Sequence, residues 1–146
     1  MKKINLILGI KIFFIYLSCF LFNSSAIGTT LDQIINPESA FSTPEGRIFV
    51  SEIGGFGLKN DGRILEVFKD GKVKVIASGL NDPKGLILVD NIIYVTDIDE
   101  IKKVTLSGKV STWLGPKNFP KKTAFLNDIA IGQNNVIYIS DSGNKV

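Results

Sequence analysis

The sequence predicts an all-β chain built from β-propeller blades, and two observations carry this prediction. A sequence motif of two short strands occurs three times, and the aromatic residue within it recurs after 45 and then after 44 residues. The recurring residues are Phe49, Tyr94 and Tyr138, each followed three positions later by an acid, Glu52, Asp97 or Asp141. One four-stranded blade takes about 40–50 residues. No segment after residue 36 has a run of apolar residues at helical spacing.

Each strand of a blade can be assigned in order. The opening pairs of strands are 37–41 with 47–52, 83–87 with 92–97, and 126–130 with 136–141. The outer pair of the first blade is 62–68 and 72–76, joined by the turn Asp70-Gly71. Alternating Lys and Val at 72–75 predict a strand with one solvent-exposed face. The outer pair of the second blade is 101–106 and 109–114, joined by Ser107-Gly108.

These strands predict about two and a half four-stranded blades. The first blade covers residues 36–80, the second covers 81–117, and 118–146 supply only the start of a third. Propellers close at about four to eight blades, so we expect the chain to be part of a larger ring, as a truncated or split gene product. Self-association that completes a ring, or a short natural form, are the alternatives.

The first 26 residues have the pattern of a signal peptide. Lys2 and Lys3 give a positive start, residues 12–22 are apolar, and residues 24–26 are small, as a cleavage site requires. An uncleaved membrane anchor over residues 4–22 is disfavoured, because inserting its central lysine into the bilayer costs about 2.5–3.5 kcal/mol. A lipoprotein signal that uses Cys19 is also disfavoured, because Tyr16 before the cysteine and the apolar residues 20–22 after it do not suit lipidation. We therefore expect an exported protein, periplasmic or extracellular, with a lead-in at 27–35 and no stable membrane association after cleavage.

The composition of the exported part excludes several classes of function. Cleavage removes three of the 17 basic residues and none of the 14 acidic ones, leaving 14 of each. Such a chain offers no basic stripe for nucleic acid. It also loses the sole cysteine and has no histidine, so Ser-His-Asp and Cys-His catalysis and the usual zinc ligand sets are excluded. Carboxylates, amides, lysines or a hard cation such as calcium or magnesium remain.

The candidate site follows from the geometry of a propeller. The first strand of each blade lines the central channel, and its start lies near the mouth. The residues at this place are Glu38 in the first blade, Lys84 and Gly85 in the second, and Asn127 and Asp128 in the third. One carboxylate and an Asn-Asp pair make a partial cation site, and Lys84 is placed to attract an anionic ligand.

Two of the blade phrases resemble a known family. Residues 37–40 with 46–52 look like the opening blade of the SMP-30/gluconolactonase/LRE-like family, and 126–131 with 137–141 are similar to its Asn-Asp phrase. NHL-repeat propellers share much of this phrasing. The resemblance implies a six-bladed propeller that hydrolyses lactones with calcium or another divalent cation. The substrate would then be a small lactone or another sugar-derived molecule.

The same resemblance implies roles for individual residues. Glu38 and Asn127 would be metal ligands, and Asn127, Asp128 and Lys84 would contact the substrate. The general base and the later metal ligands of the family would fall beyond Val146, so the catalytic residue is unknown and we expect little or no lactonase activity from this chain alone.

Simpler roles compete with these. Glu38 would satisfy main-chain amides at a strand start, and Asn127 with Asp128 would make a turn. The acids that recur in all three blades are predicted to be structural, and Trp113 is predicted to pack within the blades. The alternative function is a non-catalytic NHL-like propeller that binds a protein or a carbohydrate, with Phe56 in its glycine loop as a rim contact.

Overall fold

The structure is a computed structural model that describes residues 31–144. The predicted signal peptide lies outside these residues. Within the described part the chain forms ten strands, all in antiparallel sheets, and no α-helix. The predicted all-β fold is therefore confirmed. None of the helices described is long and apolar enough to cross a membrane.

The strands form three sheets in chain order. The first sheet contains β1 (Pro37–Ser42), β2 (Ile48–Glu52), β3 (Gly62–Val67) and β4 (Val73–Leu80). The second contains β5 (Pro83–Val89), β6 (Ile92–Asp97), β7 (Glu100–Thr105) and β8 (Val110–Leu114). The third is the hairpin of β9 (Leu126–Ile131) and β10 (Ile137–Asp141), and the short 3-10 helices η1 (Pro116–Asn118) and η2 (Gln133–Asn135) lie in the connections.

The turns between outer strands have the geometry that their sequences favour. Gly71 has a φ of 82° in the β3–β4 turn, and Gly108 has a φ of 92° in the β7–β8 turn. In both turns the glycine N–H donates to the carbonyl three residues earlier, at 2.9 Å. Glycine adopts this left-handed backbone at little cost, so these dipeptides fix where each outer hairpin reverses.

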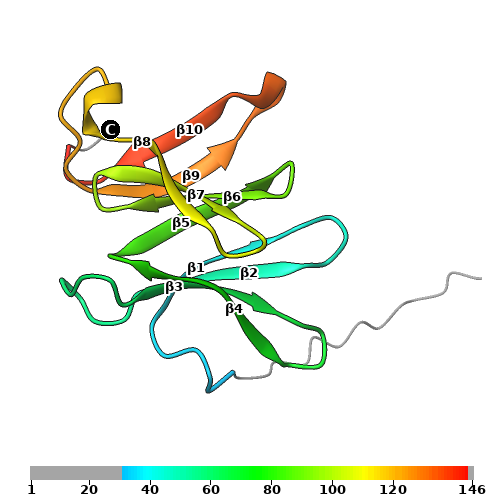
Figure 1. Cartoon of the computed structure of the whole chain (residues 1–146). Helices are drawn as coiled ribbons and strands as arrows, with labels where there is room; N and C mark the ends of the chain where they lie inside the picture. The colour runs from blue at the N-terminus through cyan, green and yellow to red at the C-terminus, as the bar shows by residue number, and fades with distance from the viewer. Residues whose placement is uncertain (1–30, 145–146) are drawn as a thin grey trace, which may run out of the picture.

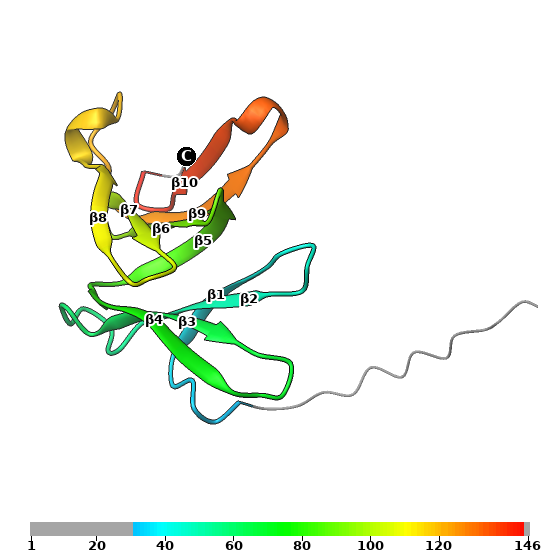
Figure 2. The same cartoon turned by 45° about the vertical axis from the view of Figure 1, so that its right-hand side comes forward.

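The three sheets stack face to face as propeller blades do. Figure 1 shows the first sheet at the bottom, the second in the middle and the third above it, and Figure 2 shows the second and third sheets both above the first. The first strand of the second sheet, β5, contacts both β1 and β9. Strands β1, β5 and β9 thus lie side by side along one edge of the stack, which places their starts at a common site.

Two apolar clusters hold the stack together. Phe49 and Ile64 of the first sheet pack with Ile93, Val95 and Val104 of the second, and all five are fully buried. The second cluster joins the second and third sheets through Ile87, Ile101, Leu126 and Ile129. Partly buried Trp113 packs against this second cluster and meets Tyr94 edge-to-face at a centroid distance of 4.7 Å. The predicted packing role of Trp113 is confirmed.

The recurring acids have the same structural role in each sheet. Each is buried at the end of the second strand and accepts main-chain hydrogen bonds from the segment that leads into the first strand. The donors are Ile35 N for Glu52 (3.1 Å), Asn81 N and Asp82 N for Asp97 (3.1 and 2.7 Å), and Ala124 N and Phe125 N for Asp141 (3.0 Å each). These bonds confirm the predicted structural role.

We expect Asp141 to make stability depend on pH in acid. Burial alone would raise its pKa, but the N–H groups of Phe125, Ala124 and Asn144 outweigh burial and lower the pKa from 3.8 to about 2. An acid with a lowered folded pKa stabilises fully above its unfolded pKa, and this contribution is lost as pH falls from about 4 towards 2. The loss of unfolding free energy between about pH 5 and pH 2.5 should be smaller in Asp141→Asn than in the wild type.

Urea unfolding at both pH values measures this difference. Asp32→Asn makes the same chemical change at an exposed position and should keep the wild-type pH dependence. An equally steep loss in Asp141→Asn would contradict the assignment.

Candidate functional site

The starts of β1, β5 and β9 bring charged side chains of three sheets together. We call this group the first-strand cluster. Its members are Glu38, Asp82, Lys84, Phe125 and Asp128. Glu38, Lys84 and Asp128 were expected at this place from the sequence, and the structure brings them together.

Lys84 is the centre of the cluster. The residue is only 5% exposed, and its Nζ lies 3.5 Å from Asp82 Oδ1 and 3.9 Å from Glu38 Oε1. The same ammonium lies 4.8 Å from the centre of the Phe125 ring, within the range of a cation–π interaction. A buried ammonium needs such partners, because an unpaired charge away from water is very costly. The Lys84–Glu38 pair also joins the second sheet to the first.

Glu38 has an environment unlike that of an ordinary surface acid. Its partial burial raises its pKa above the usual value; Lys84 acts in the opposite direction, and the carboxylates of Asp128 and Asp82 raise the pKa further. The side chain remains 26% exposed. Glu38 is therefore a carboxyl group with increased affinity for a proton that solvent or a ligand can still reach.

Asp128 lies directly against the second sheet. A Cβ placed on Gly85 would lie 2.6 Å from Asp128 Oδ1, so only glycine allows this approach of β9 to β5. Asp128 Oδ1 also accepts the Ile129 N–H at 2.9 Å, and Asp128 N donates to Ser140 Oγ at 3.0 Å. Asn127 and Asp128 lie inside strand β9, so the alternative of a turn is wrong, although Asp128 does bond the main chain beside it.

Asn127 is held through its main-chain oxygen and its side-chain nitrogen. Its main-chain oxygen accepts the hydroxyl of the fully buried Thr96 at 2.8 Å. Its side-chain Nδ2 donates to Ser142 Oγ at 3.1 Å. The side chain is therefore tied to the segment after β10, within its own hairpin unit.

The acidic side chains described here do not gather as calcium ligands. Calcium takes six to eight oxygen ligands at about 2.3–2.6 Å. Among the residues described, no three His, Cys, Asp or Glu side chains form a group that could hold a metal ion. The place beside Glu38 where such an ion would bind adjoins the Lys84 ammonium instead. Amide and main-chain oxygens also bind calcium, so the ligand roles of Glu38 and Asn127 stay predictions.

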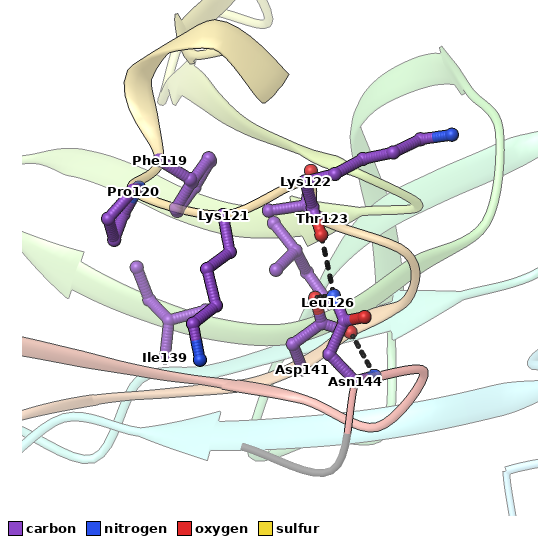
Figure 3. Close-up of a pocket in the computed structure, with 9 residues that line it drawn as sticks. All are labelled: Phe119, Pro120, Lys121, Lys122, Thr123, Leu126, Ile139, Asp141 and Asn144. Atoms are coloured by element: carbon purple, nitrogen blue, oxygen red, sulfur yellow. Dashed lines mark hydrogen bonds between the residues drawn. The ribbon is translucent and has the colours of Figure 1, made fainter.

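A pocket of about 400 Å³ lies beside the third sheet. Its apolar wall is formed by Phe119, Leu126 and Ile139, and Figure 3 shows Lys121 and Asn144 around it. The carboxylate in this pocket, Asp141, is occupied by main-chain hydrogen bonds. It is therefore a poor candidate for chemistry.

Sequence reasoning missed two members of the cluster. Asp82 lies two positions before Lys84, and this spacing places side chains on one face of an extended chain. That alternation was the available signal for Asp82. Phe125 contacts Lys84 from a segment 41 positions later in the chain, and no local pattern reveals such a contact.

Comparison with known proteins supports the fold. No family model matches the sequence, and no curated protein matches it. Among the solved structures that do match is the X-ray structure of a protein assigned as a gluconolactonase, with a TM-score of 0.54 and 15% sequence identity. The match covers 72% of this chain and 41% of that protein. The chain therefore spans about two fifths of the length of the protein it resembles, and at this identity the similarity concerns the fold.

Proposed function

We propose that this chain forms part of a lactonase-like β-propeller and binds a small lactone or another sugar-derived molecule at the first-strand cluster. The observation that carries this proposal is the meeting of Glu38, Lys84 and Asp128, each from a different sheet, at one edge of the stack. Propellers bind ligands where loops and first strands of several blades converge. The similarity in fold to a protein assigned as a gluconolactonase supports the choice of substrate class.

The cluster offers both the hydrogen-bond donors and the acceptors that a lactone needs. Glu38 is the partly exposed acid, and its raised pKa suits an acceptor or proton donor for a hydroxyl group. The Lys84 ammonium supplies donors for carbonyl or hydroxyl oxygens, and the Asn127 amide has a second N–H besides the one that Ser142 accepts. Asp128 is exposed and adds a second acceptor. These groups would hold a neutral polar ring through several hydrogen bonds.

We expect binding to exceed hydrolysis. The charge of Lys84 is already balanced by two carboxylates, so little of it is left to stabilise an oxyanion. Calcium is no part of this proposal, because no three acidic side chains of the described residues gather as its ligands. The expected turnover of lactones is accordingly slow.

One observation favours a second candidate function, a propeller that binds a protein or carbohydrate at its rim. Phe56 is 82% exposed and Leu58 is 59% exposed, both in the loop between β2 and β3. A hydrogen bond from the Gly55 N–H to Asp61 Oδ2, at 2.8 Å, holds this loop in place. Neighbouring exposed apolar side chains on a fastened loop suit a rim contact.

Glu38→Gln separates the two functions. Titrating the purified protein with five- and six-membered sugar lactones by calorimetry should show binding that the variant weakens about tenfold, because a charge-assisted hydrogen bond is lost. Glu45→Gln is the matched control, since Glu45 is exposed in the turn at the far end of β1. Circular dichroism checks that both variants fold.

Unchanged lactone affinity in Glu38→Gln would contradict binding at the cluster. Loss of carbohydrate or protein binding in Phe56→Ala, with Glu38→Gln unaffected, would support the rim instead. Rapid lactone hydrolysis by the wild-type chain would overturn the expectation of slow turnover.

A further inference from the structure

We propose that the ammonium of Lys84 is the built-in cation of the first-strand cluster and occupies the place that a divalent metal ion would need. The inference concerns the charge balance of the cluster and stands without the proposed lactone. It explains why three acids gather from three sheets while no three of them converge as metal ligands in the described part of the chain.

The burial of Lys84 is the first part of the argument. Lysine side chains normally keep their ammonium in water, whereas the Lys84 side chain is only 6% exposed. Its Nζ is directed at Asp82 and Glu38 and lies over the Phe125 ring. Two of the three acids, Asp82 and Glu38, thus face the ammonium, and Asp128 lies close enough to Glu38 to raise its pKa.

The distances are the second part. A calcium ion bound to Glu38 Oε1 would lie about 2.3–2.6 Å from that oxygen. Lys84 Nζ already lies 3.9 Å from the same oxygen, so the two cations would lie no more than about 6.5 Å apart on one carboxylate. Their repulsion disfavours calcium for as long as the ammonium is present.

Charge balance gives the third part. Glu38, Asp82 and Asp128 carry three negative charges when ionised, and Lys84 supplies one positive charge. Removing the ammonium would leave three uncompensated carboxylates close together. Such a group either destabilises the fold or recruits a cation from solution.

The test compares calcium binding by the wild type with Lys84→Met and Lys84→Gln. Calorimetry on the wild-type protein should show no saturable calcium binding up to about 1 mM, and its melting temperature should not change with calcium. Both variants should melt several degrees lower in chelator. Calcium should then raise their melting temperatures in a saturable way, because a ligand that binds only the folded state stabilises it.

Lys102→Met is the matched control. Lys102 Nζ pairs with Glu100 Oε2 at 2.8 Å in a single surface ion pair, so this variant should gain no calcium response. The double variant Lys84→Met with Glu38→Gln should lose most of the gained calcium affinity.

Saturable calcium binding by the wild type that Glu38→Gln abolishes would overturn the inference. So would folded Lys84 variants whose melting temperatures ignore calcium. A variant that is unfolded in chelator is refolded with calcium: recovery of the sheet signal in circular dichroism supports the inference, and no recovery overturns it. Lactone binding plays no part in these outcomes, so the two proposals fail separately.

Discussion

Replacing Asp97 with alanine should lower the free energy of unfolding by about 3–5 kcal/mol. The carboxylate is 2% exposed and accepts hydrogen bonds from Asn81 N at 3.1 Å and Asp82 N at 2.7 Å. Alanine would leave both N–H groups without this acceptor at the point where the chain enters β5. A donor left unsatisfied in the interior costs about 1–3 kcal/mol, and bonds to a charged acceptor are the stronger kind.

Urea unfolding followed by circular dichroism measures this loss. Asp97→Asn should lie between the wild type and Asp97→Ala, because an amide keeps one acceptor oxygen. Asp32→Ala removes an exposed carboxylate and should change stability by less than about 0.5 kcal/mol. A loss below about 1 kcal/mol for Asp97→Ala would show that the segment before β5 is held by other contacts.

Gly85→Ala should separate the second sheet from the third. The new Cβ would lie 2.7 Å from Asp128 Cα and 2.8 Å from Ile129 N. Both are backbone atoms, so a side-chain rotation cannot relieve the clash and β9 must move away from β5. Overpacking of this kind costs about 1–3 kcal/mol and occasionally more, and we expect the upper end because the Cβ meets backbone atoms that cannot rotate away.

Trp113 provides a direct readout of this separation. It is the sole tryptophan and packs against the cluster between the second and third sheets. Its fluorescence emission should shift to the red in Gly85→Ala, together with a lower urea midpoint. Gly115→Ala is the control, because its Cβ would meet only Thr112 Cγ2, at 4.0 Å. Wild-type emission and stability in Gly85→Ala would mean that the sheets adapt more easily than the geometry indicates.

The strands could be predicted because their signals are local and repeated. The turns at Gly71 and Gly108 and the spacing of Phe49, Tyr94 and Tyr138 mark the hairpins directly in the sequence. The fold class follows from these features without any contact between distant residues.

The site was less predictable, because its properties arise from contacts between sheets. The sequence placed Glu38 and Lys84 at equivalent strand starts but did not show that the lysine is buried between acids. That burial depends on how close β5 lies to its neighbours and on Phe125, which arrives from the connection before β9. The preference for a lysine over a calcium ion that we propose likewise rests on distances between residues of different sheets.

The acid at the end of each second strand has a consequence for how such chains grow. Asp97 and Asp141 bind main-chain amides of their own repeat, and Glu52 binds the main chain just before β1. Among the residues described, the second and third acids thus bond only within their own repeat, and Glu52 bonds the main chain immediately before its repeat. If one such repeat were duplicated, the copy would carry its own acid and the main-chain amides that this acid binds. Only the apolar faces that pack against the next sheet would then have to change.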